Sequence, residues 1–386
     1  MRLPVQTPEP VLALGGRLQV EPYLALGREA YPAGGIGDLD SEAARARLVE
    51  EAQALETACA HSASVVAIEL HPDSPGTWLG ERLAAARGAR LVRVQHHLAH
   101  AAAVLGEHDR FPAVGARAAA IVFDGSGYGP DGVAWGCEWL LIGGDLRWSR
   151  LAHGSELPLV GGEHAVREPW RVACAALARA VDPDLALRTP MAAVVGRRRC
   201  AEVVRLAQRP GWPRATGAGR VFEAAGALFG LCTHNRREGE AAVAFEALAS
   251  EHHGGIAPWR EVGLPSQMDE LPSARLLECA AQRLLDGEDP ARTAAGFHAT
   301  FACLAAELAD RVVPLGVVIV ALGGGCMVNR PLTSALTHAL ARRGFIGLLP
   351  CRLPPGDAAL AYGQAVLTSA ALERGLEPRL VPGGAA

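Results

Sequence analysis

The chain has 386 residues, of which 50% are hydrophobic and 20% are charged, the balance of a globular protein with a packed core. A single hydrophobic core seldom serves a chain of this length, so we expect two lobes. The net charge of -4, with no basic run longer than Arg197 to Arg199, lacks the electrostatic footprint of a nucleic-acid-binding protein.

Strands and helices alternate over the first hundred residues. An apolar strand ends at Gly15-Gly16, and an alanine-rich helix begins behind Ser41, a residue type that caps helix N-termini. This alternation indicates a largely parallel sheet. The expected elements are a strand over 11–14, a helix over 41–61, a strand over 65–70, a helix over 77–87, a strand over 91–94 and a helix from His96.

The same order of elements starts again near residue 119. An apolar strand over 119–123 reaches Asp124-Gly125 and is expected to turn through Gly127 and Gly129 into further strands. The remaining expectations are strands over 134–142 and 146–151, mostly helix over 165–249 with breaks at Thr189-Pro190 and Gly211-Trp212-Pro213, an irregular connection over 254–272, a helix over 292–313, a strand over 317–322, a helix from Arg330, a strand over 345–349, a helix over 358–374 and a mobile tail after Pro378.

Two similar beginnings indicate two related α/β lobes, built from mixed sheets with flanking helices and facing a cleft. We expect residues 1–118 to form lobe I, with the C-terminal helix 358–386 packing back on it. Residues 119–357 are expected to form lobe II, with a helical insertion over about 165–290.

Some residue types are missing. No lysine is present, so pyridoxal-phosphate enzymes and Walker-type ATPases, which need one, are excluded. Nine scattered cysteines without a C-x-x-C pair argue against a disulfide framework or a zinc ribbon. The first ten residues lack the apolar core of a signal peptide, and no long uncharged apolar stretch follows. We therefore expect a cytoplasmic protein that binds neither membranes nor nucleic acid.

Four residues are candidates for a metal site. His96 and His100 lie four apart on an expected helix, so both imidazoles project from one face and can share a metal. Asp124 follows a buried strand, and Asp357 stands directly before a helix. Surface histidines, an Asx-turn at Asp124 and a helix cap at Asp357 explain the same residues without a metal. Together the four side chains would form a mixed nitrogen and oxygen site with room for exchangeable ligands.

Glycines near these residues are candidates for cofactor binding. Residues 323–325 are glycines between a strand and a helix, where free backbone N–H groups let a phosphate or ribose approach closely. Asn329 could hydrogen-bond a ribose or base. Glu238 could contact a ribose, although without further context a solvated carboxylate at a helix end is the more common explanation. Gly125 and Gly127, behind Asp124, are expected to contribute to the same site.

Three arginines are candidates for anion binding in catalysis. Arg167, Arg171 and Arg220 occur in stretches rich in small residues, and a guanidinium binds phosphate or carbamoyl oxygens with its planar fork. Taken singly, an arginine of this kind is more often a surface or ion-paired residue.

Seven motifs resemble, in order and spacing, the carbamoyltransferase domain of HypF proteins. The resemblance covers nearly the whole chain. The motifs are VQHHLAHAA at 94–102, FDGSGYG at 123–129, REPWR at 167–171, AGRVF at 218–222, EGEAA at 238–242, GGG at 323–325 with Asn329, and PPGD at 354–357 with YGQA at 362–365.

The resemblance implies a fold, a site and a reaction. HypF domains of this kind have the actin/hexokinase-like fold, shared with TsaD-type tRNA threonylcarbamoyl transferases and antibiotic O-carbamoyltransferases. Carried onto this sequence, the family's metal ligands fall on His96, His100, Asp124 and Asp357. The nucleotide would lie near Glu238 and 323–329, with magnesium as a possible companion. The metal, iron or zinc, would polarise the carbamoyl group of a carbamoyl-adenylate made from carbamoyl phosphate and ATP. A C-terminal cysteine of the partner HypE would attack it, supplying cyanide ligands for [NiFe]-hydrogenase.

The sequence departs from full-length HypF in several places. HypF carries acylphosphatase, zinc-finger and YrdC-like domains before this one, and none fits between Met1 and Val11. We therefore expect the chain to use carbamoyl-adenylate without making it. Glu223 stands where the family has Asp, and 16–19 lacks the family's asparagine. Two alternatives stay open at this point: a small-molecule O-carbamoyltransferase and a non-catalytic maturation adaptor.

Overall fold

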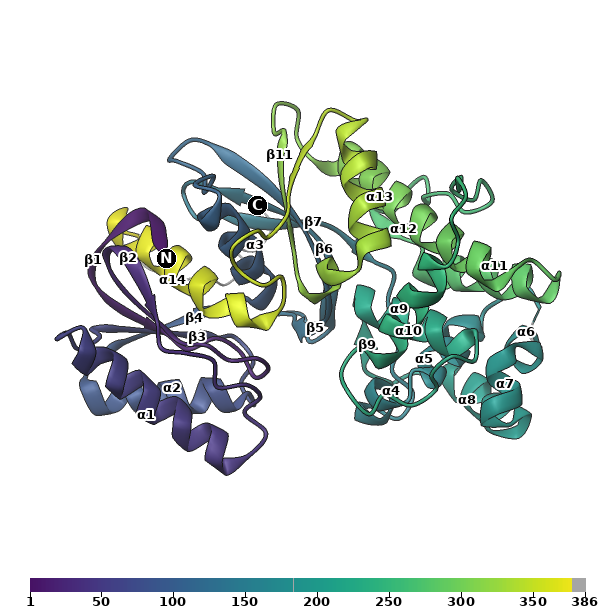
Figure 1. Cartoon of the computed structure of the whole chain (residues 1–386), viewed down its shortest axis with the longest axis horizontal. Coiled ribbons are helices and arrows are strands. Elements are labelled where there is room, and N and C mark those ends of the chain that lie inside the picture. Colours follow the sequence, from purple (N-terminus) through teal and green to yellow (C-terminus); the bar gives the residue numbers. More distant parts are fainter. Residues whose placement is uncertain (183, 377–386) are drawn as a thin grey trace.

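The computed structural model describes residues 1–182 and 184–376. It is a mixed α/β structure with two sheets, of four and eight strands. Figure 1 shows the smaller sheet at one end, the larger sheet in the middle and a group of helices at the other end. In the described residues, no helix combines the length and the apolar character needed to cross a membrane.

The smaller sheet has the strand order β2-β1-β3-β4. β1 is antiparallel to β2, whereas β3 runs parallel to both β1 and β4. All five residues of β3 are buried, as expected for a strand covered on both faces. In Figure 1, α1 and α2 lie on one side of this sheet and α14 lies on the other. The elements are β1 (Arg2–Ala13), β2 (Tyr23–Pro32), α1 (Glu42–Ala58), β3 (Val65–Glu69), α2 (Pro75–Arg87), β4 (Arg90–Val94), α3 (His96–Glu107) and α14 (Leu360–Glu373).

The larger sheet has the path β10-β7-β6-β5-β11-β12, with β9 beside β6 and β8 beside β9. β5, β6 and β7 form an antiparallel meander, and β11 joins it parallel to β5. This pairing brings the glycines after β11 beside the middle of β5. The strands are β5 (Arg117–Tyr128), β6 (Ala134–Gly143), β7 (Trp148–Gly154), β8 (Leu157–Pro158), β9 (Arg214–Ala215), β10 (Glu270–Leu271), β11 (Ile319–Gly323) and β12 (Ile346–Leu348).

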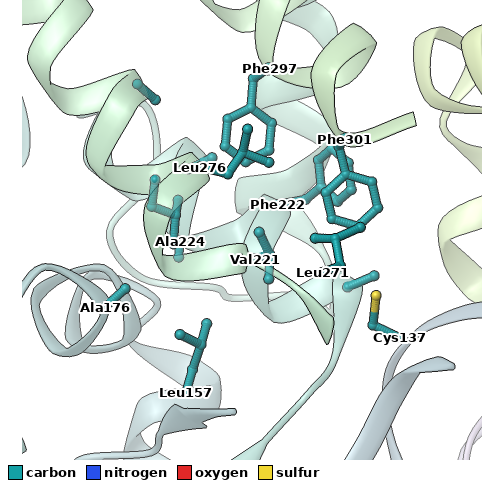
Figure 2. Packing of buried hydrophobic residues seen from close by; sticks show 14 of the residues in the cluster. Cys137, Leu157, Ala176, Val221, Phe222, Ala224, Leu271, Leu276, Phe297 and Phe301 are labelled. Carbon is teal, nitrogen blue, oxygen red and sulfur yellow. The ribbon is translucent and has the colours of Figure 1, made fainter. Parts of the chain in front are cut away.

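Helices cover the larger sheet and form most of the chain between β8 and β11. Figure 2 shows the apolar core beneath them, where Phe222 of α9 packs against Phe301 of α12 with ring centroids 5.0 Å apart. The helices are α4 (Glu163–Arg167), α5 (Trp170–Leu177), α6 (Leu185–Arg188), α7 (Pro190–Val195), α8 (Arg197–Ala207), α9 (Ala218–Leu228), α10 (Glu240–Ser250), α11 (Ser273–Leu285), α12 (Pro290–Val312), α13 (Arg330–Ala341) and the 3-10 helices η1 (Gly325–Val328) and η2 (Asp357–Ala359).

The expected helix behind Ser41 is confirmed, and the Ser41 hydroxyl accepts a hydrogen bond from the Ala44 N–H at 3.1 Å. Helix α14 packs on β1 and α3, and the Tyr362 hydroxyl donates to the Arg2 carbonyl at 2.6 Å. This packing agrees with the expected return of the C-terminal helix, although 377–386 lies outside the described residues. The lobe boundaries at 118 and 357 and the cleft between the lobes stay predictions.

The prediction that the chain already turns at Gly127 is wrong, whereas a turn does follow at Gly129. β5 continues to Tyr128, because Gly127 pairs with Trp135 of β6 after a shift in register that follows Phe123. The tight turn comes later, where the Gly129 N–H donates to the Val133 carbonyl at 3.0 Å. Asp124 therefore lies at an irregularity inside a strand, rather than at the start of a turn.

Two other expectations about element ends are corrected. The first strand begins at Arg2 rather than residue 11, because β2 returns as its antiparallel partner along nearly its whole length. Asp357 does not cap the last helix with its side chain. It is the first residue of η2, and the N-cap position of α14 is Ala359.

Candidate metal centre and its surroundings

Four side chains from distant parts of the sequence converge at one point. His96 Nε2 lies 2.9 Å from Asp124 Oδ2 and 3.7 Å from Asp357 Oδ1. His100 Nε2 lies 3.3 Å and 3.5 Å from the same two oxygens. The two Nε2 atoms are 3.2 Å apart. All four ligand atoms lie within 4.8 Å of one another, so one metal ion can contact them together.

The local fold explains how each histidine is placed. Gln95 caps α3, since its Oε1 accepts the Leu98 N–H at 3.0 Å, and the helix therefore starts at His96. His100 follows one turn later on the same face. A Cβ at Gly323 would lie 3.2 Å from the His100 Cβ, so this glycine lets β11 approach the helix closely. The spacing in the sequence and the packing of α3 together aim both imidazoles at the same place.

The two carboxylate oxygens of Asp124 have different partners. Its Oδ1 accepts backbone N–H groups from Gly125 at 2.9 Å and from Gly325 at 3.2 Å. Its Oδ2 faces His96 and His100. The backbone behind β11 thus fixes the carboxylate and leaves one oxygen directed at the histidines.

The four side chains are largely buried, and burial and the neighbouring charges together shift the pKa values of His96, His100 and Asp124. Burial lowers the pKa of His96, but Asp357, Asp124 and Glu69 outweigh it and hold that pKa well above its usual value. The pKa of His100 is raised in the same sense, because Asp124 and Asp357 outweigh burial. Burial raises the pKa of Asp124, yet its contacts with the two histidines hold it well below the usual range. Without a cation, protons on the imidazoles therefore balance the carboxylates.

This donor set fits a divalent metal. Two imidazole nitrogens and two carboxylate oxygens form a mixed site of the kind that iron and zinc, the two expected metals, accept. A second group, Glu107, His108 and Cys351, also has ligand atoms within 4.8 Å of one another. There, however, the Glu107 carboxylate already accepts the backbone N–H groups of residues 351–353 at 2.8 to 3.1 Å. Through these hydrogen bonds, Glu107 holds the loop that follows β12 in place.

Glu69 belongs to the centre, and the sequence reasoning missed it. Its Oε1 lies 2.6 Å from His96 Nδ1, and both side chains are buried. The only available signal was a carboxylate at the end of an otherwise apolar strand. Nothing in the local pattern links it to a histidine 27 residues further along.

His97, between the two candidate ligands, is not part of the cluster. Its Nδ1 lies 3.0 Å from the Gln95 amide nitrogen. Burial and the neighbouring His96 hold its pKa well below the usual value, so it is neutral. A Cβ at Gly127 would come within 2.8 Å of both the His96 and His97 rings. Gly127 is therefore required for β5 to pass these histidines, whatever its role toward a cofactor.

Arg220 and Glu238 lie beside the metal centre. The Arg220 side chain is buried and pairs with Glu223 at 2.7 Å. It also donates to the Gly125 carbonyl at 3.3 Å, next to Asp124. A Cβ on Gly125 would lie 3.0 Å from Arg220 Nη2 and 3.8 Å from Glu238 Oε1. Arg220, Glu238 and Gly125, three of the expected catalytic and cofactor-binding residues, therefore lie close together.

Glu238 lines a cavity of about 690 Å³ with Arg236, Arg237, Glu240 and Val243. Desolvation of its carboxyl group, together with the charges of Asp357 and Asp124, raises the pKa of Glu238 to about 7. The carboxylates of the metal centre therefore act on this residue through space. A cavity lined by two arginines and two glutamates is polar enough to receive a phosphorylated ligand.

The other expected cofactor residues pack against the centre. Gly324 has a φ of +91°, and a Cβ there would overlap the Phe123 carbonyl oxygen. Gly325 donates to Asp124, and Gly323 touches His100, as described above. Asn329 caps α13, where its Oδ1 accepts the Leu332 N–H at 3.0 Å and its Nδ2 contacts His298 Nε2 at 3.1 Å. Its side chain is thus already held by the fold, and the expected ribose contact stays a prediction.

Arg167 and Arg171 lie in another cluster. Arg171 pairs with Glu168 and lies over the Trp170 ring at 4.9 Å. Arg167 is exposed, and its carbonyl accepts the Asn235 N–H at 2.8 Å. Within residues 1–182 and 184–376, no hydrogen bond or ion pair joins either arginine to the four candidate ligands. Their catalytic roles stay predictions.

Two family models match the chain. The model described as the HypF Kae1-like domain matches residues 6–107. The model described as the carbamoyltransferase, Kae1-like domain, second subdomain, matches residues 120–364. The interval between them, residues 108–119, runs from the end of α3 into the first residues of β5, where the second run of strands begins.

Curated relatives agree with these matches. A protein named carbamoyltransferase HypF homolog from Cupriavidus necator is 38% identical over 363 residues, which span 92% of this chain and 90% of that protein. Carbamoyltransferase HypF from Rhodobacter capsulatus is 35% identical over 372 residues, which span 95% of this chain but 48% of that protein. The chain therefore spans nearly all of one relative and about half of the other.

Solved structures show the same relation. A crystal structure of full-length HypF in the phosphate- and nucleotide-bound form superposes with a TM-score of 0.85 at 26% identity, covering 96% of this chain and 57% of that one. HypF from T. kodakarensis gives the same TM-score and identity over 99% of this chain and 50% of that one. These matches confirm the fold class expected from the resemblance, the two-lobed actin/hexokinase-like fold. The chain therefore belongs to the HypF family of carbamoyltransferases, to whose Kae1-like domain its residues 6–107 and 120–364 correspond.

Proposed function

We propose that this chain transfers a carbamoyl group from carbamoyl-adenylate, or from carbamoyl phosphate, to the C-terminal cysteine of a HypE-type protein for [NiFe]-hydrogenase maturation. The observation that carries the proposal is the convergence of His96, His100, Asp124 and Asp357 within 4.8 Å. A non-catalytic adaptor has no need of such a centre. The free state of all nine cysteines fits a cytoplasmic site of action, which belongs to the same proposal.

The four convergent side chains would hold iron or zinc. A metal bound there acts as a Lewis acid on a carbamoyl oxygen. The protein's own contribution is orientation: Asp124 is fixed by two backbone N–H groups, and the histidines by the packing of α3 against β11. Burial of these groups excludes water, which would otherwise hydrolyse the activated carbamoyl group.

The nucleotide portion of the substrate would occupy the cavity at Glu238. Arg236 and Arg237 lie at that cavity and can balance the phosphate charge, with magnesium as a further counter-ion. Arg220, next to Gly125, would orient the carbamoyl group, whereas Arg167 and Arg171 would act only if the substrate extends toward α5. Binding of a nucleotide is supported by the HypF structure solved in a phosphate- and nucleotide-bound form, and its identity as an adenine nucleotide belongs to the proposal.

The attacking group would be the thiolate of the partner. The carbonyl carbon of the carbamoyl group bonds to the cysteine sulfur, and the bond to the phosphate oxygen breaks. The thiol proton is released, and AMP or phosphate leaves with the bonding electron pair. The chain therefore needs no nucleophile of its own for this transfer.

Supplying synthetic carbamoyl-adenylate and a purified HypE-type acceptor tests the proposal. Mass spectrometry should detect a carbamoyl group on the acceptor's C-terminal cysteine with the wild-type chain. His100→Ala should reduce the rate at least 100-fold, within the range found for loss of electrostatic transition-state stabilisation. His338→Ala is the matched control, because that histidine is exposed on α13. A wild-type chain that leaves the cysteine unmodified would exclude this acceptor.

A further inference from the structure

A buried carboxylate lies directly behind the metal centre. Glu69 is the last residue of β3, and its Oε1 is 2.6 Å from His96 Nδ1. Glu69 and His96 are only 6% and 4% exposed. On its other ring nitrogen, Nε2, His96 faces Asp124 at 2.9 Å. The imidazole thus stands between a carboxylate outside the ligand cluster and the cluster itself.

The position of Glu69 is costly for a purely structural residue. An ionised carboxylate inside a protein loses much of its hydration, so it is retained only when it is paired or hydrogen-bonded. The four preceding residues of β3 are apolar and buried, and an apolar side chain would continue that pattern without the desolvation cost. Gly16 lies beside this carboxylate, and a Cβ there would be in ordinary van der Waals contact with Glu69 Oε2 at 3.5 Å.

The hydrogen bond determines which nitrogen of His96 is available. A carboxylate accepts but does not donate, so the proton between the two groups belongs on Nδ1. Nε2 is then left without a proton when the imidazole is neutral, and its lone pair points to Asp124 and Asp357. The same contact limits rotation of the ring.

We propose that Glu69 is a positioning residue of the metal centre, which orients His96 and keeps Nε2 as its metal-binding nitrogen. The inference rests on the metal site of the proposed function and adds a fifth side chain to it. A carboxylate behind a ligating histidine also increases the electron density on the ligating nitrogen, so loss of such partners typically weakens metal binding about 10- to 100-fold.

Substitutions at Glu69 separate orientation from charge. Glu69→Gln retains an oxygen that accepts the Nδ1 proton but has no negative charge, so we expect metal affinity to fall about 10-fold. Glu69→Leu removes the acceptor as well, and affinity should fall about 100-fold. Zinc dissociation constants of the full chain are measured by competition with a chromophoric chelator. The metal-free unfolding midpoint of each variant is recorded alongside, so that a general loss of folding is recognised.

Glu56→Gln is the matched control. Glu56 is also a buried glutamate, 7% exposed, and it pairs with Arg87 at 2.6 Å in the same part of the fold. Its substitution should change stability and leave the zinc dissociation constant unchanged. A purely structural role for Glu69 predicts the same behaviour for both residues.

Nitrogen-15 spectra of the histidine rings give a second readout. In the zinc-loaded wild type, His96 should show a metal-bound Nε2 and a protonated Nδ1. Equal zinc affinity of wild type and Glu69→Leu, or zinc bound to His96 through Nδ1, would overturn the inference and leave the proposed function in place. A wild-type chain that binds no metal would overturn the metal site and the role of Glu69 together.

Discussion

At the scale of single residues, the metal centre depends on groups whose charges are set by one another. His96 and His100 have raised pKa values because carboxylates surround them, so they hold protons at a higher pH than free imidazoles. A metal can bind their Nε2 atoms only after those protons leave. Metal binding and proton release are therefore linked.

We predict that metal affinity decreases as the pH falls from about 8 to about 6. Each displaced proton should weaken binding about tenfold per pH unit, so two imidazoles allow up to about 100-fold per pH unit. Titration calorimetry in two buffers with different ionisation enthalpies should show proton release on zinc binding. An affinity that does not change over this range would contradict the protonation states inferred for the cluster.

Gly324 illustrates a second residue-level effect. From the sequence, the glycine at this position is expected to let a phosphate or ribose approach the backbone closely. The structure gives a different reason for glycine, since a Cβ would overlap the Phe123 carbonyl oxygen, and φ is +91°. The sequence showed that the glycine lies between a strand and a helix, but the neighbouring strand comes from residues about two hundred positions earlier.

Gly324→Ala should therefore destabilise the protein itself. Gly316→Ala is the matched control, because Gly316 has a similar φ of +88° with no atom within 4 Å of its Cβ position. The control should cost about 1 to 2 kcal/mol through backbone strain alone. Gly324→Ala should cost a further 1 to 3 kcal/mol, roughly the effect of overpacking. Urea denaturation measures both, and equal losses would show that the Phe123 contact is unimportant.

Most of the residues in the centre could be found from the sequence, for different reasons. The pair His96 and His100 follows from helical spacing, which is a local property. Asp124 and Asp357 are candidates from their places at the ends of expected elements, but each also has an ordinary structural explanation, and the resemblance to HypF favours them as ligands. Glu69 could not be found, because its partner is defined by tertiary packing. Arg167 and Arg171 illustrate the opposite case. Both belong to a motif of the sequence, but in the described residues neither bonds to any of the four candidate ligands.

At the scale of elements, most of the long helices and strands have the type expected from the sequence, whereas β2 has no counterpart among the expected elements. The exact ends of the elements depend on their packing partners. The helix starting at His96 and the strand before Gly323 were expected from local pattern. The continuation of β5 through its glycines was not, because Gly127 pairs with Trp135 of β6 and passes His96 and His97 closely. Pattern alone reads a glycine-rich stretch as a turn.

The position of Asp357 at the start of the 3-10 helix η2 allows a role as metal ligand to be distinguished from a role as helix cap. Asp357 begins this 3-10 helix, and its side chain makes no capping hydrogen bond. Asp357→Ala should therefore weaken metal binding by more than about 100-fold, the upper effect of an indirect partner. Its metal-free stability should not show the loss of about 1 kcal/mol typical of a removed cap.

Ser41→Ala provides the comparison, because Ser41 does cap α1 through a hydrogen bond to the Ala44 N–H. That variant should lose about 1 kcal/mol of unfolding free energy and retain full metal affinity. Parallel urea and metal titrations of the two variants measure both quantities. If Asp357→Ala loses stability and affinity in proportion, Asp357 acts through the fold rather than as a ligand.

At the scale of the whole molecule, the centre forms only when distant segments meet. α3 follows the smaller sheet, Asp124 belongs to the larger sheet, and Asp357 arrives through the segment that leads into α14. α14 then packs on β1 and α3. Figure 1 shows α14 beside the first strands of the chain. The chain thus uses the junction of its two sheets to assemble ligands that are up to 261 positions apart, from His96 to Asp357.

One measurement tests this account most directly. Crystals of the wild-type chain, grown with iron or zinc, are measured on both sides of the metal's absorption edge. We predict one anomalous peak about 2.0 to 2.2 Å from His96 Nε2, His100 Nε2 and a carboxylate oxygen of Asp124 and of Asp357. A peak at Glu107, His108 and Cys351 instead, or a fully metal-exposed crystal without a peak at the four residues, would contradict the account.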